Sequence, residues 1–339
     1  MALTKSGAVL AFVALALLAA LIPGTAEFGA HKSARPKTSV LLVGWDGAEG
    51  PLVQLMMESG QLPNLARLAA KGGYADMTVD EGRTQTKPGW SQILTGYDTT
   101  TIGVTSNADY QPIPSGLTVF EKLRSKYGDG IQVLFISGKD NNLGARGPHY
   151  LCTNCVHRYE NRSKTDWWED NTTAPFTGSE RVMELRKGEP YYNAVAAVDE
   201  YESGLGGCQN VAATALRWLG NESGPFFAFV HFEEPDEQGH QYGEGSAEYA
   251  GALKKDDYWL GQLVSKAEER NGRGATVVIV TSDHGFDEAG FDHKDAPHTF
   301  LAANIKIAAE GTRRDVAPTI LAIYGIESTP QMHGKSMAG

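Results

Sequence analysis

The sequence holds six side chains that could bind metal ions if the fold brings them together: Asp46, Asp236, His240, Asp283, His284 and His298. Asp236 and His240 are four residues apart, a spacing that points both side chains the same way on one helical turn. Asp283 and His284 are adjacent, and Gly285 permits the irregular backbone that they need to share a site. Carboxylates and imidazoles without a thiolate suit zinc or another divalent first-row metal.

A lone Asp-Gly after a strand is usually a turn, and a lone histidine is usually a surface or core residue. Three aspartates and three histidines at one edge of a sheet are much harder to attribute to chance. Two divalent ions about 4 Å apart could clamp the attacking and leaving oxygens of a phosphoryl transfer. We therefore expect a pair of metal ions.

Thr86 is a candidate nucleophile. It lies in Thr84–Trp90, a segment expected to open a helix, and a helix N-terminus attracts anions through its backbone N–H groups. A threonine in this position could equally well cap the helix. The residue types alone leave both roles open.

The elements that must position these groups follow from apolar runs that end in polar residues, at 39–43, 132–136, 226–230 and 276–280. Such runs indicate buried strands of a mostly parallel sheet. Helical patterns separate them at 62–70, 117–126, 209–219, 247–269 and 315–324. The alternation predicts an α/β fold, a doubly wound sheet sandwiched by helices. Because ligands bind outside the carboxyl ends of such strands, the candidate residues are expected to converge there.

The domain organisation is predicted from the same pass along the chain. Lys5 precedes an apolar run at 8–22 and small residues near Ala26, a pattern typical of a cleaved signal peptide at 1–26. A flexible tail is expected at 27–37 and one hydrolase domain at 38–339. Residues 141–200 break the alternation and are rich in Trp, Asn and Thr, which favours an inserted cap near the site. The protein is then periplasmic or secreted, or membrane-tethered if the N-terminal segment is not cleaved.

The composition and the net charge limit the classes of molecule that the protein is expected to bind. Hydrophobic residues make up 41% of the 339 positions, enough for a sizeable core, and the formal net charge is -11. This balance disfavours a nucleic-acid-binding surface, which needs clustered Lys and Arg. It also leaves no reason to expect membrane contact after signal cleavage. The oligomeric state is left open. The three cysteines, Cys152, Cys155 and Cys208, allow one disulfide and one free thiol, and a structural role is expected for the close pair.

The chain resembles the alkaline phosphatase superfamily, and most closely its type I phosphodiesterase/nucleotide pyrophosphatase branch. The matching motifs are Asp46-Gly47, Thr86 two residues before Pro88, Thr95-Gly96, Asn107, Glu233–His240, Ser282–Gly285 and Asp315–Leu321. The resemblance covers nearly the whole chain after the N-terminal segment, apart from the cap. It implies an alkaline phosphatase-like fold and a small-molecule phosphate ester as substrate.

The resemblance also implies roles for single residues. One metal ion would be held by Asp46, Thr86, Asp283 and His284, and the other by Asp236, His240 and His298. His293, five residues upstream of His298, is the alternative for the last ligand. The catalytic residues implied are Thr86, as nucleophile through a covalent phosphothreonine, and Asn107, which would hold a phosphate oxygen together with the backbone N–H of Lys87. The two divalent ions are expected to be Zn²⁺.

Two positions depart from patterns within the superfamily. Trp90 replaces a histidine common after the proline that follows the nucleophile. Superfamily sulfatases need a Cys or Ser that becomes formylglycine and an Arg four residues later, whereas this chain has Thr86 and Trp90. A sulfatase is therefore disfavoured, and a catalytically silent binding protein is disfavoured because no expected ligand is lost.

The substrate choice has two alternatives. A diester needs an apolar pocket for its second substituent, which Trp167, Trp168, Tyr191 and Tyr192 could supply. Phosphomonoester hydrolysis or phosphosugar transfer needs extra positive charge, from Lys87, Lys139 or Arg146. We expect a phosphodiesterase or nucleotide pyrophosphatase first and the monoester chemistry second.

Overall fold

The fold is that of a computed structural model, which describes residues 35–139, 142–144, 149–152, 183–186, 188–221, 223–272 and 274–339. The predicted signal peptide, most of the tail, and residues 153–182 of the predicted cap lie outside this range, as do Trp167, Trp168 and Arg146. No helix among the described residues is both long and apolar enough to cross a membrane.

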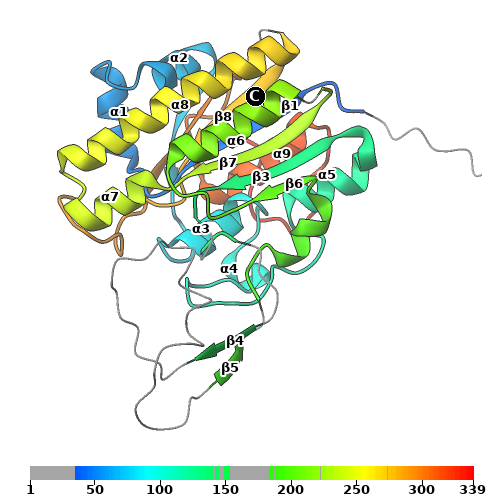
Figure 1. Ribbon diagram of the computed structural model, residues 1–339, viewed down its shortest axis with the longest axis horizontal. Coiled ribbons are helices and arrows are strands. Elements are labelled where there is room, and N and C mark those ends of the chain that lie inside the picture. Colours follow the sequence, from blue (N-terminus) through cyan, green and yellow to red (C-terminus); the bar gives the residue numbers. More distant parts are fainter. Residues whose placement is uncertain are drawn as a thin grey trace, which may run out of the picture. The chain divides into compact units, whose positions relative to one another are not determined.

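An eight-stranded sheet organises the chain, in the order β10-β2-β9-β8-β1-β7-β3-β6 (Figure 1). The strands are β1 (Ser39–Trp45), β2 (Gly73–Thr78), β3 (Gln132–Ser137), β6 (Glu200–Glu202), β7 (Phe226–Phe232), β8 (Thr276–Thr281), β9 (His298–Ala303) and β10 (Glu310–Thr312). Strand β9 is antiparallel to both β2 and β8, and the other neighbouring pairs are parallel. The start of β9 therefore lies at the same edge as the carboxyl ends of the others.

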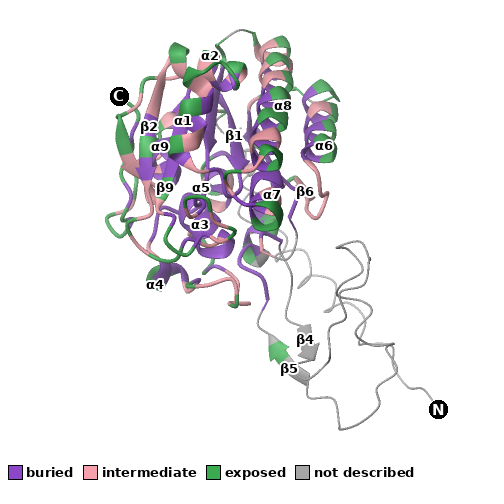
Figure 2. Cartoon of the chain, turned by 90° about the vertical axis from the view of Figure 1, so that its left-hand side faces the viewer, coloured by how far each residue is buried: buried purple, intermediate pink, exposed green. Residues whose placement is uncertain are grey.

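Helices cover both faces of this sheet. One face packs against α1 (Gly50–Glu58), α2 (Pro63–Lys71), α6 (Cys208–Asn221) and α8 (Ala247–Asn271), whereas α3 (Thr86–Ile93), α5 (Val119–Tyr127) and α9 (Val316–Ile323) pack against the other (Figures 1 and 2). The remaining helical segments are α4 (Thr99–Ile102), α7 (Glu234–Tyr242) and the short 3₁₀ turns Gly128–Gly130, Tyr192–Ala197 and Arg313–Asp315. The predicted α/β sandwich with a mostly parallel sheet is confirmed.

Strand β1 shows why the central strands read as continuous apolar runs. Successive side chains of a strand point to opposite faces. Val40 and Leu42 pack into the core under α3, α5 and α9, while Leu41 and Val43 pack into the core under α1, α2, α6 and α8. All seven residues of β1 are buried. A strand covered by helices on both sides has no polar face, so its sequence does not alternate.

Local signals fix several helix boundaries. Helix α5 begins with a capping box, in which the Thr118 hydroxyl accepts from the Glu121 N–H while the Glu121 carboxylate accepts from the Thr118 N–H. Helix α8 begins after Ser246, whose hydroxyl accepts from the Tyr249 N–H. The predicted helices at 62–70, 117–126, 209–219, 247–269 and 315–324 correspond to α2, α5, α6, α8 and α9, within two residues at each end.

The predicted cap region contains a small two-stranded sheet of its own. Strand β4 (His149–Cys152) pairs antiparallel with β5 (Met183–Arg186). The end of the region belongs to the body of the fold, because Tyr191, Ala194 and Ala197 pack in the core and β6 joins the main sheet beside β3. Tyr191 is 1% exposed and its ring contacts that of Phe135 at a tilt, with the centroids 5.5 Å apart, so it is a core residue and not a wall of a substrate pocket.

Candidate active site

Three adjacent parallel strands bring the candidate residues to one edge of the sheet. Asp46 follows β1 and donates its N–H to the carbonyl of Phe232 at the end of β7. Asp236, in the first turn of α7, donates its N–H to the carbonyl of Asp46, 3.0 Å away. Asp283 follows β8, and its Oδ1 accepts from the Gly47 N–H at 3.2 Å. The predicted convergence at the carboxyl ends is therefore observed.

Gly47 makes the close approach of these segments possible. Its φ is +67°, in the left-handed region that favours glycine. A Cβ at this position would also lie 3.0 Å from the Asp236 backbone and 2.9 Å from the Phe286 ring. The Asp-Gly pair after β1 thus turns the chain sharply while letting α7 pack against it.

The first candidate metal group consists of Asp46, Asp283 and His284, all fully buried. The His284 Nε2 lies 3.7 Å from Asp46 Oδ1 and 3.4 Å from Asp283 Oδ2. Neither His284 Nε2 nor Asp283 Oδ2 has a hydrogen-bond partner among the described residues. Buried lone pairs that face one another without a donor are costly unless a cation satisfies them.

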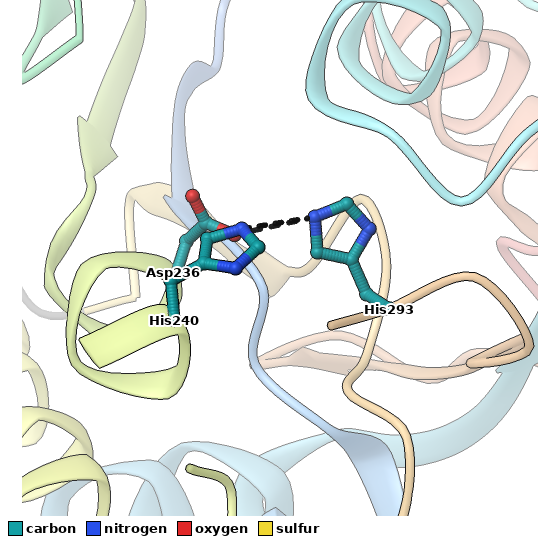
Figure 3. A group of neighbouring side chains, drawn as sticks. All are labelled: Asp236, His240 and His293. Carbon is teal, nitrogen blue, oxygen red and sulfur yellow. Dashed lines mark hydrogen bonds and ion pairs between the residues drawn. The ribbon is translucent and has the colours of Figure 1, made fainter. Parts of the chain in front are cut away.

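The second candidate metal group consists of Asp236, His240 and His293 (Figure 3). Asp236 Oδ1 lies 3.4 Å from His240 Nε2 and 3.8 Å from His293 Nε2, and the two Nε2 atoms are 3.2 Å apart. Asp236 Oδ1 has no hydrogen-bond partner in the described part of the chain. The two groups adjoin, because His284 Nε2 is also 3.8 Å from Asp236 Oδ1.

The sequence prediction of His298 in this second group is corrected by the structure. His298 is the first residue of β9, where it is exposed and paired in register with Thr78 of β2. His293 lies in the connection from β8 to β9, which passes beside α7 and brings the ring, 8% exposed, next to His240. The sequence positions of the two histidines could not show which one joins the second group, because that depends on the path of the connection between β8 and β9.

All three histidines of the two groups are held in the same way. The Nδ1 of His284 lies 2.9 Å from the Gly285 carbonyl, that of His240 lies 2.9 Å from the Phe291 carbonyl, and that of His293 lies 2.5 Å from the Thr84 carbonyl. A carbonyl can only accept, so each Nδ1 carries the proton and each Nε2 presents its lone pair to the groups. This is the arrangement that ligand histidines have at metal centres.

Asp46 is oriented by two further side chains. Its Oδ2 accepts from Trp90 Nε1 at 3.1 Å and lies 2.8 Å from His231 Nε2. The other oxygen of Asp46, Oδ1, therefore faces His284, another member of the first group. Trp90, the departure noted in the sequence, thus takes a polar role as well as a packing role, with its ring filling the space above Gly44. Residue patterns did not single out His231, because it lies inside a run of apolar strand residues.

Thr86 lies beside both groups and does not cap its helix. The N-cap of α3 is Gln85, and Thr86 is the first helical residue, 2% exposed. Its hydroxyl oxygen is 3.4 Å from Lys139 Nζ. Asn107 lies close by, because its Oδ1 accepts from the Lys87 N–H at 2.9 Å. The helix N-terminus, Asn107 and the hydroxyl therefore lie together. The Lys87 N–H, predicted to hold a phosphate oxygen, instead donates to Asn107 in this structure.

Lys139 is the one lysine side chain found between the carboxylates in the described part of the chain. Its Nζ donates to Asp46 Oδ1 at 2.8 Å and to Asp236 Oδ2 at 2.5 Å. Burial by itself would lower the pKa of Lys139, but the two carboxylates outweigh it and raise that pKa, so the ammonium is charged. Lys87, by contrast, is fully buried and paired with Glu189 at 3.2 Å, and is not available to a substrate.

The charges of the site favour cations. Burial, together with the neighbouring carboxylates of Asp46 and Asp236, raises the pKa of Asp283 well above its usual value. Burial and the nearby His284 lower the pKa of His293 to about 4, so its imidazole is neutral. Three buried carboxyl groups beside one ammonium crowd negative charge, so Asp283 holds its proton more tightly, and a bound divalent ion would relieve that crowding.

The residues of the two groups fit a pair of metal ions, because they present orphaned lone pairs and neutral imidazoles. Each group offers carboxylate oxygens and imidazole nitrogens and no sulfur, a set that suits zinc and similar divalent ions. A cavity of about 430 Å³ is lined by Thr86, Asn107, Lys139, Asp236, His240 and His293, among others. A small-molecule ligand can therefore reach the Thr86 hydroxyl and the second group together, while the first group is buried and adjoins the second through Asp236.

Fold and site together define an α/β protein with two adjoining candidate metal groups beside a threonine hydroxyl. A family model described as type I phosphodiesterase / nucleotide pyrophosphatase matches residues 40–334, and the chain belongs to that family. The resemblance predicted from the motifs is thereby confirmed. The family is metal-dependent.

Similar proteins agree with this placement. The chain is 25% identical over 280 residues to human bis(5'-adenosyl)-triphosphatase ENPP4, covering 81% of this chain and 53% of that protein. It is 37% identical over 79 residues to venom phosphodiesterase 2 of Crotalus adamanteus, covering 23% of this chain and 10% of that protein. The chain thus spans about half the length, or less, of these curated relatives. The solved structure of murine ectonucleotide pyrophosphatase/phosphodiesterase 5 shares the fold, with a TM-score of 0.56 and 12% identity over 86% of this chain and 96% of that one.

Proposed function

We propose that this protein hydrolyses phosphate esters, as a phosphodiesterase or nucleotide pyrophosphatase that uses Thr86 as its nucleophile. The observation that carries the proposal is the set of orphaned lone pairs of Asp236, Asp283 and His284. Lys139 links them to the nucleophile, because its Nζ contacts Asp46, Asp236 and the Thr86 hydroxyl. The names of the relatives, a triphosphatase and phosphodiesterases, support the substrate class.

The proposed metal assignment takes the two groups of side chains from the structure and adds Thr86 from the family resemblance. Asp46, Thr86, Asp283 and His284 would hold one divalent ion, and Asp236, His240 and His293 would hold the other. When bound, the pair would lower the pKa of the hydroxyl and offset negative charge on the phosphoryl oxygens. We propose zinc for both positions because of the mixed carboxylate and imidazole donors.

The chain's own groups would then carry out two displacements. Thr86 Oγ1 forms a bond to phosphorus as the bond to the leaving oxygen breaks, and the hydroxyl proton is released to solvent. Asn107 keeps its amide nitrogen free to donate to a phosphoryl oxygen, since its Oδ1 is taken by the Lys87 N–H. Water then cleaves the bond between threonine and phosphorus, which restores the hydroxyl and releases the phosphorylated product.

The test is a comparison of Thr86→Ala with Thr86→Ser on bis-p-nitrophenyl phosphate. We expect Thr86→Ala to lose at least about a thousandfold in kcat/KM and the serine variant to keep part of the activity. Metal content should stay close to that of the wild type in both. Each attack on this diester releases one p-nitrophenolate, so acid quenching during turnover, followed by mass spectrometry, should find a p-nitrophenyl phosphoryl group on the peptide that contains Thr86. Equal activity in the alanine variant would exclude the nucleophile assignment.

A second candidate, phosphomonoester hydrolysis, is favoured by Lys139. Its ammonium points into the cavity 3.4 Å from the Thr86 hydroxyl, where it could bind the extra negative charge of a monoester. A charge-assisted hydrogen bond contributes about 1.5–3 kcal/mol, or roughly 10- to 150-fold in rate. If monoesters are the substrates, Lys139→Met should lower kcat/KM for p-nitrophenyl phosphate by that factor and much less for the bis ester.

A sulfatase function finds no support in the site. A structure described as a 2-O GAG sulfatase shares the fold, with a TM-score of 0.58 at 13% identity over 89% of this chain and 73% of that one, which concerns the fold alone. Threonine cannot be converted into the formylglycine aldehyde, and Trp90 occupies the position of the required arginine. We expect p-nitrophenyl sulfate not to be hydrolysed.

We further propose that the protein is exported, with a small-molecule phosphate ester as its only required partner. The N-terminal pattern of Lys5 and the apolar run at 8–22 supports this. Sequencing of the mature N-terminus should find a start near Glu27, and a chain that retains Met1 would contradict signal cleavage.

A further inference from the structure

A second cluster of ligand-type side chains lies apart from the site, where three helices meet. Cys208 is the first residue of α6, Glu234 is the first of α7, and Asp256 lies within α8. They are 1%, 9% and 0% exposed. One sulfur and two carboxylate oxygens lie within 4.8 Å of one another. Cys208 packs with the apolar core residues of α6 and α8, so the cluster is inside the protein and not in the cavity.

The two carboxylates of this cluster have fewer hydrogen-bond donors than oxygen atoms that need one. Glu234 Oε1 accepts from the Cys208 N–H. Glu234 Oε2 and both oxygens of Asp256 have no hydrogen-bond partner among the residues that the structure describes. The Cys208 thiol interacts with both carboxylates, but a thiol is a weak donor with a single hydrogen and can serve only one oxygen. At least two buried carboxylate oxygens remain unsatisfied, which is costly without a cation.

The neighbouring Asp257 differs from Asp256, because both of its carboxylate oxygens accept hydrogen bonds. Its Oδ1 accepts from the Leu65 N–H at 2.7 Å and its Oδ2 from the Asn64 N–H at 3.1 Å, so it caps α2. Asp256, one residue earlier, turns into the interior instead. Lys255 acts on Asp256 through its charge, but its own side chain is exposed. The structure shows no ion pair that neutralises Asp256 among its described residues.

We propose that Cys208, Glu234 and Asp256 bind a third divalent metal ion of the zinc class, separate from the two groups at the active site. Sulfur and carboxylate oxygen together suit zinc or cobalt and disfavour magnesium and calcium, which prefer oxygen alone. Binding displaces the thiol proton to solvent, since the thiolate is the ligand. The ion joins the beginnings of α6 and α7 to α8, and α7 carries Asp236 and His240.

Cobalt substitution tests this without any turnover. A thiolate bound to Co²⁺ gives a strong charge-transfer absorption in the near ultraviolet, and the two groups at the active site contain no cysteine. The full-length protein, stripped of metal and titrated with Co²⁺, should therefore show this band. Absence of the band, with Co²⁺ still bound elsewhere, would overturn the proposal and leave a proton shared between buried carboxylates as the explanation.

Variants assign the band to Cys208. The double variant Cys152→Ser/Cys155→Ser, in which Cys208 is the only cysteine left, should keep the band. Cys208→Ser should lose it and bind one equivalent less of zinc than the wild type. If Cys208→Ser does not fold, Asp256→Asn should show the same loss of one equivalent. A band that survives in Cys208→Ser and disappears in the double variant would refute the site.

Discussion

The choice between His293 and His298 gives the sharpest test of the site, because the two residues are chemically identical and five positions apart. His293 Nε2 lies 3.2 Å from His240 Nε2 and 3.8 Å from Asp236 Oδ1, with the ring almost fully buried. His298 is exposed at the start of β9. We expect His293→Ala to weaken zinc binding strongly and His298→Ala to leave it close to that of the wild type.

The magnitude follows from what the ring contributes. Removing a side chain that only supports a ligand typically costs 10- to 100-fold in metal affinity. His293 is placed as a ligand, one of three in its group, so its loss should cost at least the upper end of that range. A hundredfold loss corresponds to about 2.7 kcal/mol. His298 contributes no side chain to either group, and its replacement should change affinity by less than about threefold, the scatter of surface substitutions.

The assay is competition for zinc with a chromophoric chelator, together with kcat/KM on bis-p-nitrophenyl phosphate. Both variants should unfold at a similar urea concentration in the metal-free form, which controls for damage to the fold. The reasoning is refuted if His298→Ala loses zinc and activity while His293→Ala keeps them. Equal losses in both variants would also refute it, since the structure separates the two rings.

Three further outcomes are expected. Trp90→Phe removes one of the two donors to Asp46 Oδ2, so zinc affinity should fall about 10- to 100-fold in the same competition assay. An unchanged affinity would show that Asp46 does not need this hydrogen bond to bind the metal. Lys87→Met removes the ammonium that pairs with the buried Glu189 and should lower the free energy of unfolding in urea by about 3–5 kcal/mol, with partial recovery when Glu189→Gln is added. A loss below about 1 kcal/mol, roughly the contribution of a surface pair, would contradict a buried pair in solution. Chelation should abolish ester hydrolysis and added Zn²⁺ should restore it, whereas full activity without metal would contradict the metal assignment.

Residue patterns alone predicted much of this fold. Continuous apolar runs marked β1, β3, β7 and β8, because strands buried on both faces carry no polar alternation. Helical patterns between these runs marked α2, α5, α6, α8 and α9. The reversal of β9 was not predicted, since a strand's direction depends on the path of the connection before it and leaves no mark on its own residues.

The candidate site was predictable to the extent that its residues follow strands or form local motifs. Asp46 follows β1 directly, Asp283 and His284 come within three residues of the end of β8, and Asp236 and His240 occupy one helical turn. Their convergence is a consequence of parallel neighbouring strands. The ligand role of these residues is still a proposal that the metal analyses above will decide.

The sequence by itself determined the strands β1, β3, β7 and β8, the helices α2, α5, α6, α8 and α9, and most of the ligand-type residues, because those depend on the chain's local pattern. Only the tertiary structure decided which histidine joins Asp236, why Trp90 and His231 face Asp46, and that Lys139 lies between two carboxylates. It also brought Cys208 and Asp256 together from separate helices. These contacts join residues far apart along the chain, so they depend on the paths of the loops and the packing of the helices. Neither can be predicted from a short stretch of sequence.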